Sequence, residues 1–136
     1  MRKNKRDFVF YEQALELEKL GFKELCFGYF NDGEFIHSPV IMGKLFPIDK
    51  NKLKENQCLS PLYQEAFEWF RLKWGYNSWV EQTGNINSYL YNYKIYGNGV
   101  YHRPIHTPSN YPYCKSYEEA ELELLKELII IVKEIE

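Results

Sequence analysis

What this 136-residue sequence lacks already excludes several classes of protein. Its three cysteines, Cys26, Cys58 and Cys114, are far apart and form no CxxC pair, so neither a disulfide framework nor a zinc knuckle is expected. The longest unbroken apolar run, residues 128–132, is far shorter than the roughly 20 residues of a membrane-spanning helix. No apolar stretch follows the basic N-terminus, which predicts that no signal peptide is present. These absences together predict a protein of the reducing cytoplasm with no membrane partner.

The chain also lacks a dominant charge and the common catalytic motifs. Its 17 Lys and Arg residues nearly balance its 19 Asp and Glu residues, for a net charge of −2. No P-loop, GxGxxG or HExxH pattern occurs, so no cofactor and no enzymatic activity are expected. Aromatic residues, by contrast, make up 18% of the chain. They favour a surface that binds other molecules, although the codon bias of an AT-rich genome would have the same effect.

Turn signals and apolar periodicity predict an α+β fold. A helical pattern over residues 11–20 ends at Gly21, and a hairpin follows with its turn at residues 31–33. A second helix is expected to start with Ser60 as N-cap and Pro61 at the first position, and to end at Gly75. Two or three strands between residues 77 and 103 and a helix from Ser116 onward complete the pattern.

The expected architecture is an antiparallel sheet of four or five strands, covered on one face by about three helices in the order α-ββ-α-ββ(β)-α. We expect a single domain over residues 1–136, with a basic flexible tail at residues 1–7 and a C-terminal helix at residues 116–136. Residues 38–59 are irregular in sequence, and a short strand near residues 40–42 is one interpretation of them.

Three stretches resemble a known group of proteins: residues 11–29, with Tyr-Glu-Gln-Ala-Leu and then Cys-Phe-Gly-Tyr; residues 61–71, Pro-Leu-Tyr-Gln-Glu-Ala-Phe-Glu-Trp-Phe-Arg; and residues 117–121, Tyr-Glu-Glu-Ala-Glu. Together they are similar to small proteins, without an assigned activity, of Bacteroidota and their phages and mobile elements. The resemblance implies a phage or mobile-element setting and no particular chemistry.

A weak alternative is a small metal protein or enzyme. His102 and His106 are four residues apart, and Cys114 lies eight residues further on, which are residue types that bind zinc or form a thiolate–imidazole pair. Pro104 stands between the histidines, so a helix that would place both on one face is not expected.

A second alternative is a protein that binds single-stranded nucleic acid. The basic arm would contact phosphates, and a row of alternating tyrosines would stack bases on a sheet face. The same row is equally typical of a sheet core under helices. The residues concerned are Arg2, Lys3, Lys5, Arg6, Tyr89, Tyr91 and Tyr93.

The leading hypothesis is a small non-enzymatic protein that acts by binding a protein partner, with a homodimer as one form. Aromatic and arginine side chains are favoured anchors at such interfaces. The expected contact residues are Tyr101, Arg103, His106, Tyr111 and Tyr113.

Overall fold

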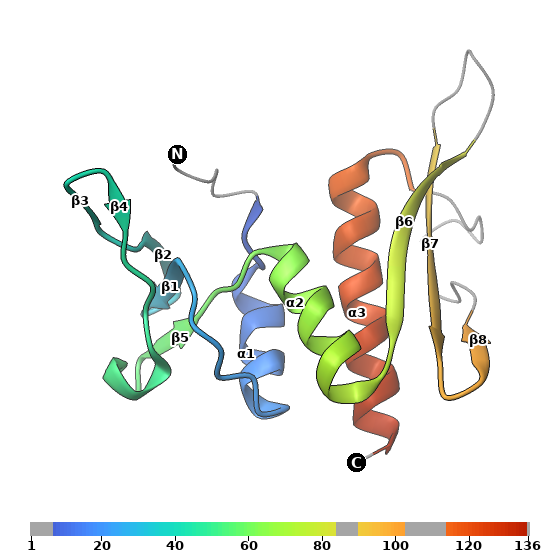
Figure 1. The fold of residues 1–136 in the computed structure, drawn as a ribbon, viewed down its shortest axis with the longest axis horizontal. Helices are drawn as coiled ribbons and strands as arrows, with labels where there is room; N and C mark the ends of the chain where they lie inside the picture. The colour runs from blue at the N-terminus through green and yellow to red at the C-terminus, as the bar shows by residue number, and fades with distance from the viewer. Residues whose placement is uncertain (1–6, 84–89, 103–113, 136) are drawn as a thin grey trace. The chain divides into compact units, whose positions relative to one another are not determined.

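The computed structural model describes residues 7–83, 90–102 and 114–135 (Figure 1). Its elements in chain order are α1 (Tyr11–Lys19), β1 (Gly28–Asn31), β2 (Glu34–His37), β3 (Val40–Ile41), β4 (Lys44–Leu45), the 3-10 turn η2 (Lys50–Lys52), β5 (Gln57–Leu59), α2 (Tyr63–Trp69), the π-helical segment η3 (Phe70–Trp74), β6 (Asn77–Thr83), β7 (Leu90–Gly97), β8 (Val100–His102) and α3 (Tyr117–Ile135).

The α+β class and the antiparallel pairing are confirmed. The described strands lie in three small sheets, of orders β2-β1-β5, β3-β4 and β6-β7-β8, where the sequence had indicated one sheet of four or five strands. The chain divides into two compact units, Met1–Ala66 and Phe67–Glu136, which are described separately below. Whether the units form one domain stays a prediction.

The first unit begins with the expected helix and hairpin. Helix α1 ends where Gly21 adopts a φ of +97°, a backbone conformation that glycine tolerates best. The β1–β2 hairpin turns at Asp32 and Gly33, whose φ values are +52° and +82°. Phe30 is the buried aromatic residue of β1, and its ring packs 5.1 Å from that of Tyr11 in α1.

The segment at residues 38–59 contains more structure than its irregular sequence indicates. The expected short strand is β3, which pairs with β4, and β5 returns to pair with β1 so that Cys58 lies opposite Phe30. Strand β5 also packs against α1. The predicted irregular region therefore supplies the third strand of the first sheet.

The prediction for the start of the second helix was wrong. Helix α2 starts at Tyr63, and the hydroxyl of Ser60 donates instead to the carbonyl of Val9, at 2.8 Å. The capping group is the carboxylate of Glu65, which accepts from the Leu62 N–H at 2.8 Å. The predicted end at Gly75 is confirmed, with a φ of +79°.

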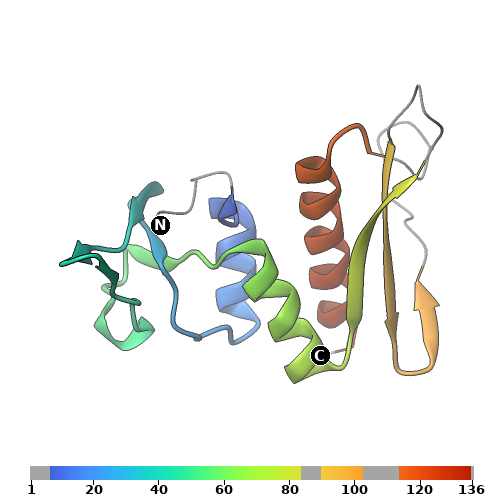
Figure 2. The ribbon, with the colours of Figure 1, turned by 45° about the horizontal axis from the view of Figure 1, so that its top comes forward.

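In the second unit, α3 packs along β6 and β7 (Figures 1 and 2). Ser116 caps the helix as predicted, since the Glu119 N–H donates to the Ser116 hydroxyl at 3.1 Å. The other half of the predicted capping box differs, because the Glu119 carboxylate accepts from the Lys115 N–H, at 3.3 Å, rather than from that of Ser116. The β7–β8 turn at Asn98 and Gly99 is also as predicted, and both residues have positive φ. Among the described residues, no helix is long and apolar enough to cross a membrane.

Candidate functional site

A short hairpin in the first unit presents apolar side chains to solvent. Strands β3 and β4 pair Val40 with Leu45 and Ile41 with Lys44, and we call residues 40–46 the apolar hairpin. Its exposed apolar side chains, with the exposed fraction of each, are Val40 (38%), Ile41 (54%), Met42 (96%) and Phe46 (45%). Val40 and Ile41 point to opposite faces of the ribbon, so apolar side chains are exposed on both faces and at the tip. Exposed apolar side chains concentrated in one short segment are a candidate for contact with another molecule.

The tip of the apolar hairpin combines exposure with an unfavourable backbone conformation. Met42 has a φ of +53° and precedes Gly43, whose φ is +79°. A turn with positive φ at both central residues favours Asn-Gly. For an L-residue with a larger side chain, the left-handed backbone region costs roughly 1–2 kcal/mol. Met42 is thus both the most exposed apolar residue of the hairpin and one in an unfavourable backbone conformation. This combination suggests that Met42 has a role other than stabilising the fold.

The sequence within and just after the apolar hairpin is mildly basic. Lys44 lies within it, and Lys50, Lys52 and Lys54 follow along the chain, against the acids Asp49 and Glu55. Lys44 is the one ionisable side chain of residues 40–46, which include no carboxylate, imidazole or thiol. These residues can bind an apolar surface that has acidic groups nearby.

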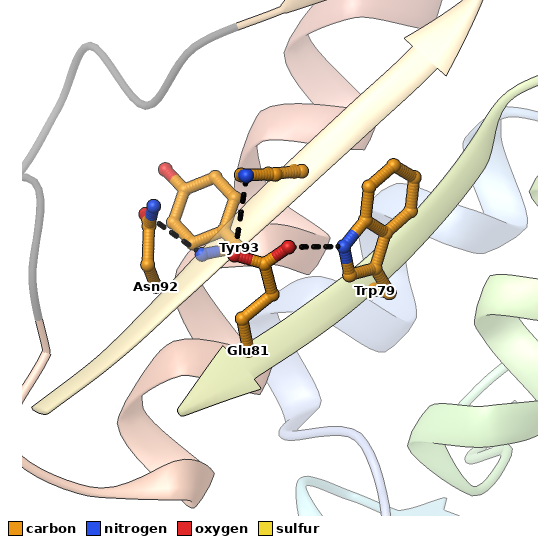
Figure 3. A network of polar contacts seen from close by, with 5 residues as sticks. Trp79, Glu81, Asn92 and Tyr93 are labelled. Atoms are coloured by element: carbon orange, nitrogen blue, oxygen red, sulfur yellow. Dashed lines mark hydrogen bonds and ion pairs between the residues drawn. The ribbon is translucent and has the colours of Figure 1, made fainter. Parts of the chain in front are cut away.

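A second exposed surface lies on the β6-β7-β8 sheet, on the face away from α3. Residues of β6 and β7 alternate between the two faces, and Trp79 pairs with Lys94. Trp79 and Tyr96 are 40% and 47% exposed. The Glu81 carboxylate accepts from the Trp79 indole Nε1 at 2.8 Å and lies 3.2 Å from the Lys94 ammonium (Figure 3).

These contacts stabilise the charged form of Glu81. The hydrogen bond from Trp79 and then that from Lys94 hold the pKa of its carboxyl below the ordinary value. The indole N–H and the ammonium are both satisfied by one carboxylate, as expected for a solvated antiparallel sheet face. On this surface the indole N–H of Trp79 therefore already has its hydrogen-bond partner.

A platform that stacks bases needs exposed tyrosine rings, and Tyr93 in the middle of β7 is not exposed. Tyr93 is only 2% exposed, and its pKa is raised by burial and by Glu127 and Glu123 of α3. Tyr91 is half-buried, with its ring 6.0 Å from that of Tyr117. Tyr93 is thus part of the core under α3, and Tyr89 lies outside the described residues.

Of the predicted His/Cys set, only Cys114 has a side chain among the described residues. This thiol is buried, and burial raises its pKa to about 11, which disfavours a thiolate at neutral pH. The backbone of Cys114 pairs with Tyr91, and that of His102 with Ile95, while His106 lies outside the described residues. The described part of the chain contains no group of His, Cys, Asp and Glu side chains that could hold a metal ion.

Most other predicted contact residues fall outside the residues that the structure describes. Only the backbone of Tyr101 is placed, opposite Tyr96 in the β7–β8 ladder. The residues outside are Arg2, Lys3, Lys5, Arg6, Arg103, His106, Tyr111 and Tyr113.

Reasoning from the sequence missed both exposed surfaces. The strand at residues 40–42 was one interpretation, but the run Val-Ile-Met by itself looks like core. Alternation in the strand at residues 77–82 could have placed Trp79 and Glu81 on one face, since they are two residues apart. Comparisons with family models, with curated proteins and with solved structures gave no match.

Proposed function

We propose that this is a non-enzymatic protein that binds another protein through the apolar hairpin. The observation that carries the proposal is Met42, whose side chain is 96% exposed at a turn position of positive φ. A solvent-facing turn with no partner would be more stable with Asn or Gly there. A methionine makes sense at this point if a partner covers it, because its flexible thioether adapts to apolar pockets.

The energy available from the apolar hairpin suits a specific complex of moderate strength. Full burial of a Val, Ile, Met or Phe side chain contributes about 1.5–3 kcal/mol each. Association itself costs roughly 4–15 kcal/mol, so four partly exposed side chains need help from neighbouring contacts. The lysines that follow the hairpin would supply it against an acidic rim on the partner.

We further propose that the protein works in the cytoplasm, in the phage or mobile-element setting that the resemblance implies. Support for a reducing compartment comes from the cysteines, since Cys26, Cys58 and Cys114 are all unpaired and buried. Burial raises the pKa of Cys58 to about 12, which keeps this thiol protonated at neutral pH.

The proposal is tested by affinity capture from a bacterial lysate with three baits: the wild type, Met42→Asn with Ile41→Ser, and Leu72→Ser. Leu72 is an exposed apolar residue (73%) far along the chain from the hairpin, so its variant is the matched control. We expect a protein retained by the wild type and by Leu72→Ser to be lost from the hairpin variant. Equal retention by all three baits would contradict the proposal.

A nuclease arm separates protein binding from nucleic-acid binding. The captured partner should persist after nuclease treatment of the lysate. Loss of all retained proteins on treatment would instead support a nucleic-acid binder, whose affinity would fall steeply with salt. Purified partner and protein should then form a complex whose Kd is weakened at least tenfold by the hairpin variant, a change of about 1.4 kcal/mol.

A further inference from the structure

Strand β6 is an edge strand whose outer backbone groups can be identified. Strands β7 and β8 are joined by a two-residue turn, with Gly97 opposite Val100. In such a hairpin the pair next to the turn exchanges both hydrogen bonds, so Gly97 and every second residue before it bond on the β8 side. Tyr91 follows this alternation, since its N–H and C=O bond to Cys114 at 2.8 and 2.6 Å.

The alternation fixes which residues of β6 point their backbone outward. Lys94 and Asn92 must bond on the β6 side, to Trp79 and Glu81. The N–H and C=O groups of the residues between them therefore point away from β7; they are Ser78, Val80 and Gln82. In the described part of the chain, no backbone hydrogen bond from outside the sheet reaches these groups.

Within β6 itself, several devices that usually prevent strands from pairing are absent. The seven residues of β6 include no proline and no lysine, and the ladder with β7 continues without a bulge from Asn77 to Thr83. Natural edge strands are commonly short, charged, bulged or covered. A regular edge of this length, with Glu81 as its one charged residue, is a template for another strand.

We propose that two copies of this chain pair through β6, antiparallel about a two-fold axis at Val80, into one continuous sheet. With Val80 opposite Val80 of the second copy, Ser78 lies opposite Gln82. These are the residues whose backbone groups point outward, so each facing pair can exchange both hydrogen bonds. A register shifted by one residue would face outward groups against inward ones and lose the ladder.

The side chains also complement themselves in this register. The Ser78 hydroxyl is buried without a hydrogen-bond partner among the described residues, while Gln82 is exposed. Directly opposite side chains lie about 4.5–5.5 Å apart at Cβ, so the Gln82 amide of the second copy can reach that hydroxyl. Glu81 is the one charged residue of β6. In this register it faces Trp79 of the second copy, so the two Glu81 carboxylates do not face each other.

Cysteine cross-linking tests the register directly. Opposite Val80 residues would have Cα atoms about 5.5 Å apart, within the range of a disulfide. Gln82→Cys is the matched control, because the two Gln82 positions would be four residues, about 13 Å, apart. We expect Val80→Cys to give a covalent dimer on mild oxidation and Gln82→Cys not to, with little background from the buried native thiols.

Mass measurement by light scattering tests the dimer without cross-linking. The wild type should show twice the 16.4 kDa mass of one chain. Val80→Pro removes an outward N–H that β7 does not use, so it should give a folded monomer, whereas Val80→Thr should remain a dimer. A monomeric wild type, or equal cross-linking of Val80→Cys and Gln82→Cys, would overturn the proposal. The hairpin variant should leave the mass unchanged, so the two proposals fail separately.

Discussion

Replacing Met42 by asparagine should stabilise the protein while weakening partner binding. Met42 is 96% exposed, so its side chain makes few contacts that the substitution could remove. Its φ of +53° disfavours an ordinary L-residue by roughly 1–2 kcal/mol, and asparagine tolerates that region much better. The free energy of unfolding should therefore rise by about 1 kcal/mol, which corresponds to a Tm increase of about 4 °C for a chain of this size.

Two further variants separate the backbone from the side chain. Met42→Gly should stabilise by a comparable amount, reduced by the greater freedom of glycine in the unfolded chain. Met42→Ala removes the side chain and keeps the backbone cost, so its stability should stay near that of the wild type. Urea unfolding gives the midpoint and the slope, and an unchanged slope shows that only stability has changed. A stability of Met42→Asn below that of the wild type would refute the reasoning.

Three other outcomes follow from buried or paired groups. Tyr93→Phe should raise the free energy of unfolding by about 1 kcal/mol, because the hydroxyl is buried without a hydrogen-bond partner among the described residues; a loss in urea unfolding would show that it is bonded. Glu81 has a lowered pKa, so its stabilising contacts are present at neutral pH and are lost only as the pH falls through that lowered value. The Trp79 indole N–H resonance should therefore titrate with a midpoint below the ordinary 4.5, and a midpoint at or above 4.5 would contradict this. Native Cys114, with its pKa of about 11 against an ordinary 9.0, should react with iodoacetamide about a hundredfold more slowly at neutral pH than in the unfolded chain, as read by peptide mass spectrometry; comparable rates would argue against burial.

Features governed by neighbouring residues could be predicted from the sequence. The helix ends at Gly21 and Gly75 and the turns at Asp32-Gly33 and Asn98-Gly99 depend on local backbone preferences, and all are where the sequence indicated. The N-cap at Ser116 is equally local. Such signals gave the class and the order of elements.

Features governed by residues that are distant in the chain could not be predicted from the sequence. Ser60 has every property of an N-cap, but it bonds to Val9, which is 51 residues away in the chain. Strand β5 has three residues, too few for a period, and exists because β1 offers it a partner. The exposure of Met42 was equally hidden, since an apolar run predicts burial wherever the fold around it is unknown.

The π-helical segment η3 (Phe70–Trp74) has a consequence for how this chain can vary in length. Beyond it, at the helix end, the Gly75 N–H bonds to the carbonyl of Arg71, four residues earlier, and the Tyr76 N–H to that of Phe70, six residues earlier, both at 3.2 Å. A π turn closes one more residue between its bonded groups than an α turn does. Loss of one residue here would convert the wide turn into an ordinary one without altering the elements on either side. The segment is therefore a place where an insertion or deletion of a single residue can be absorbed by the helix itself.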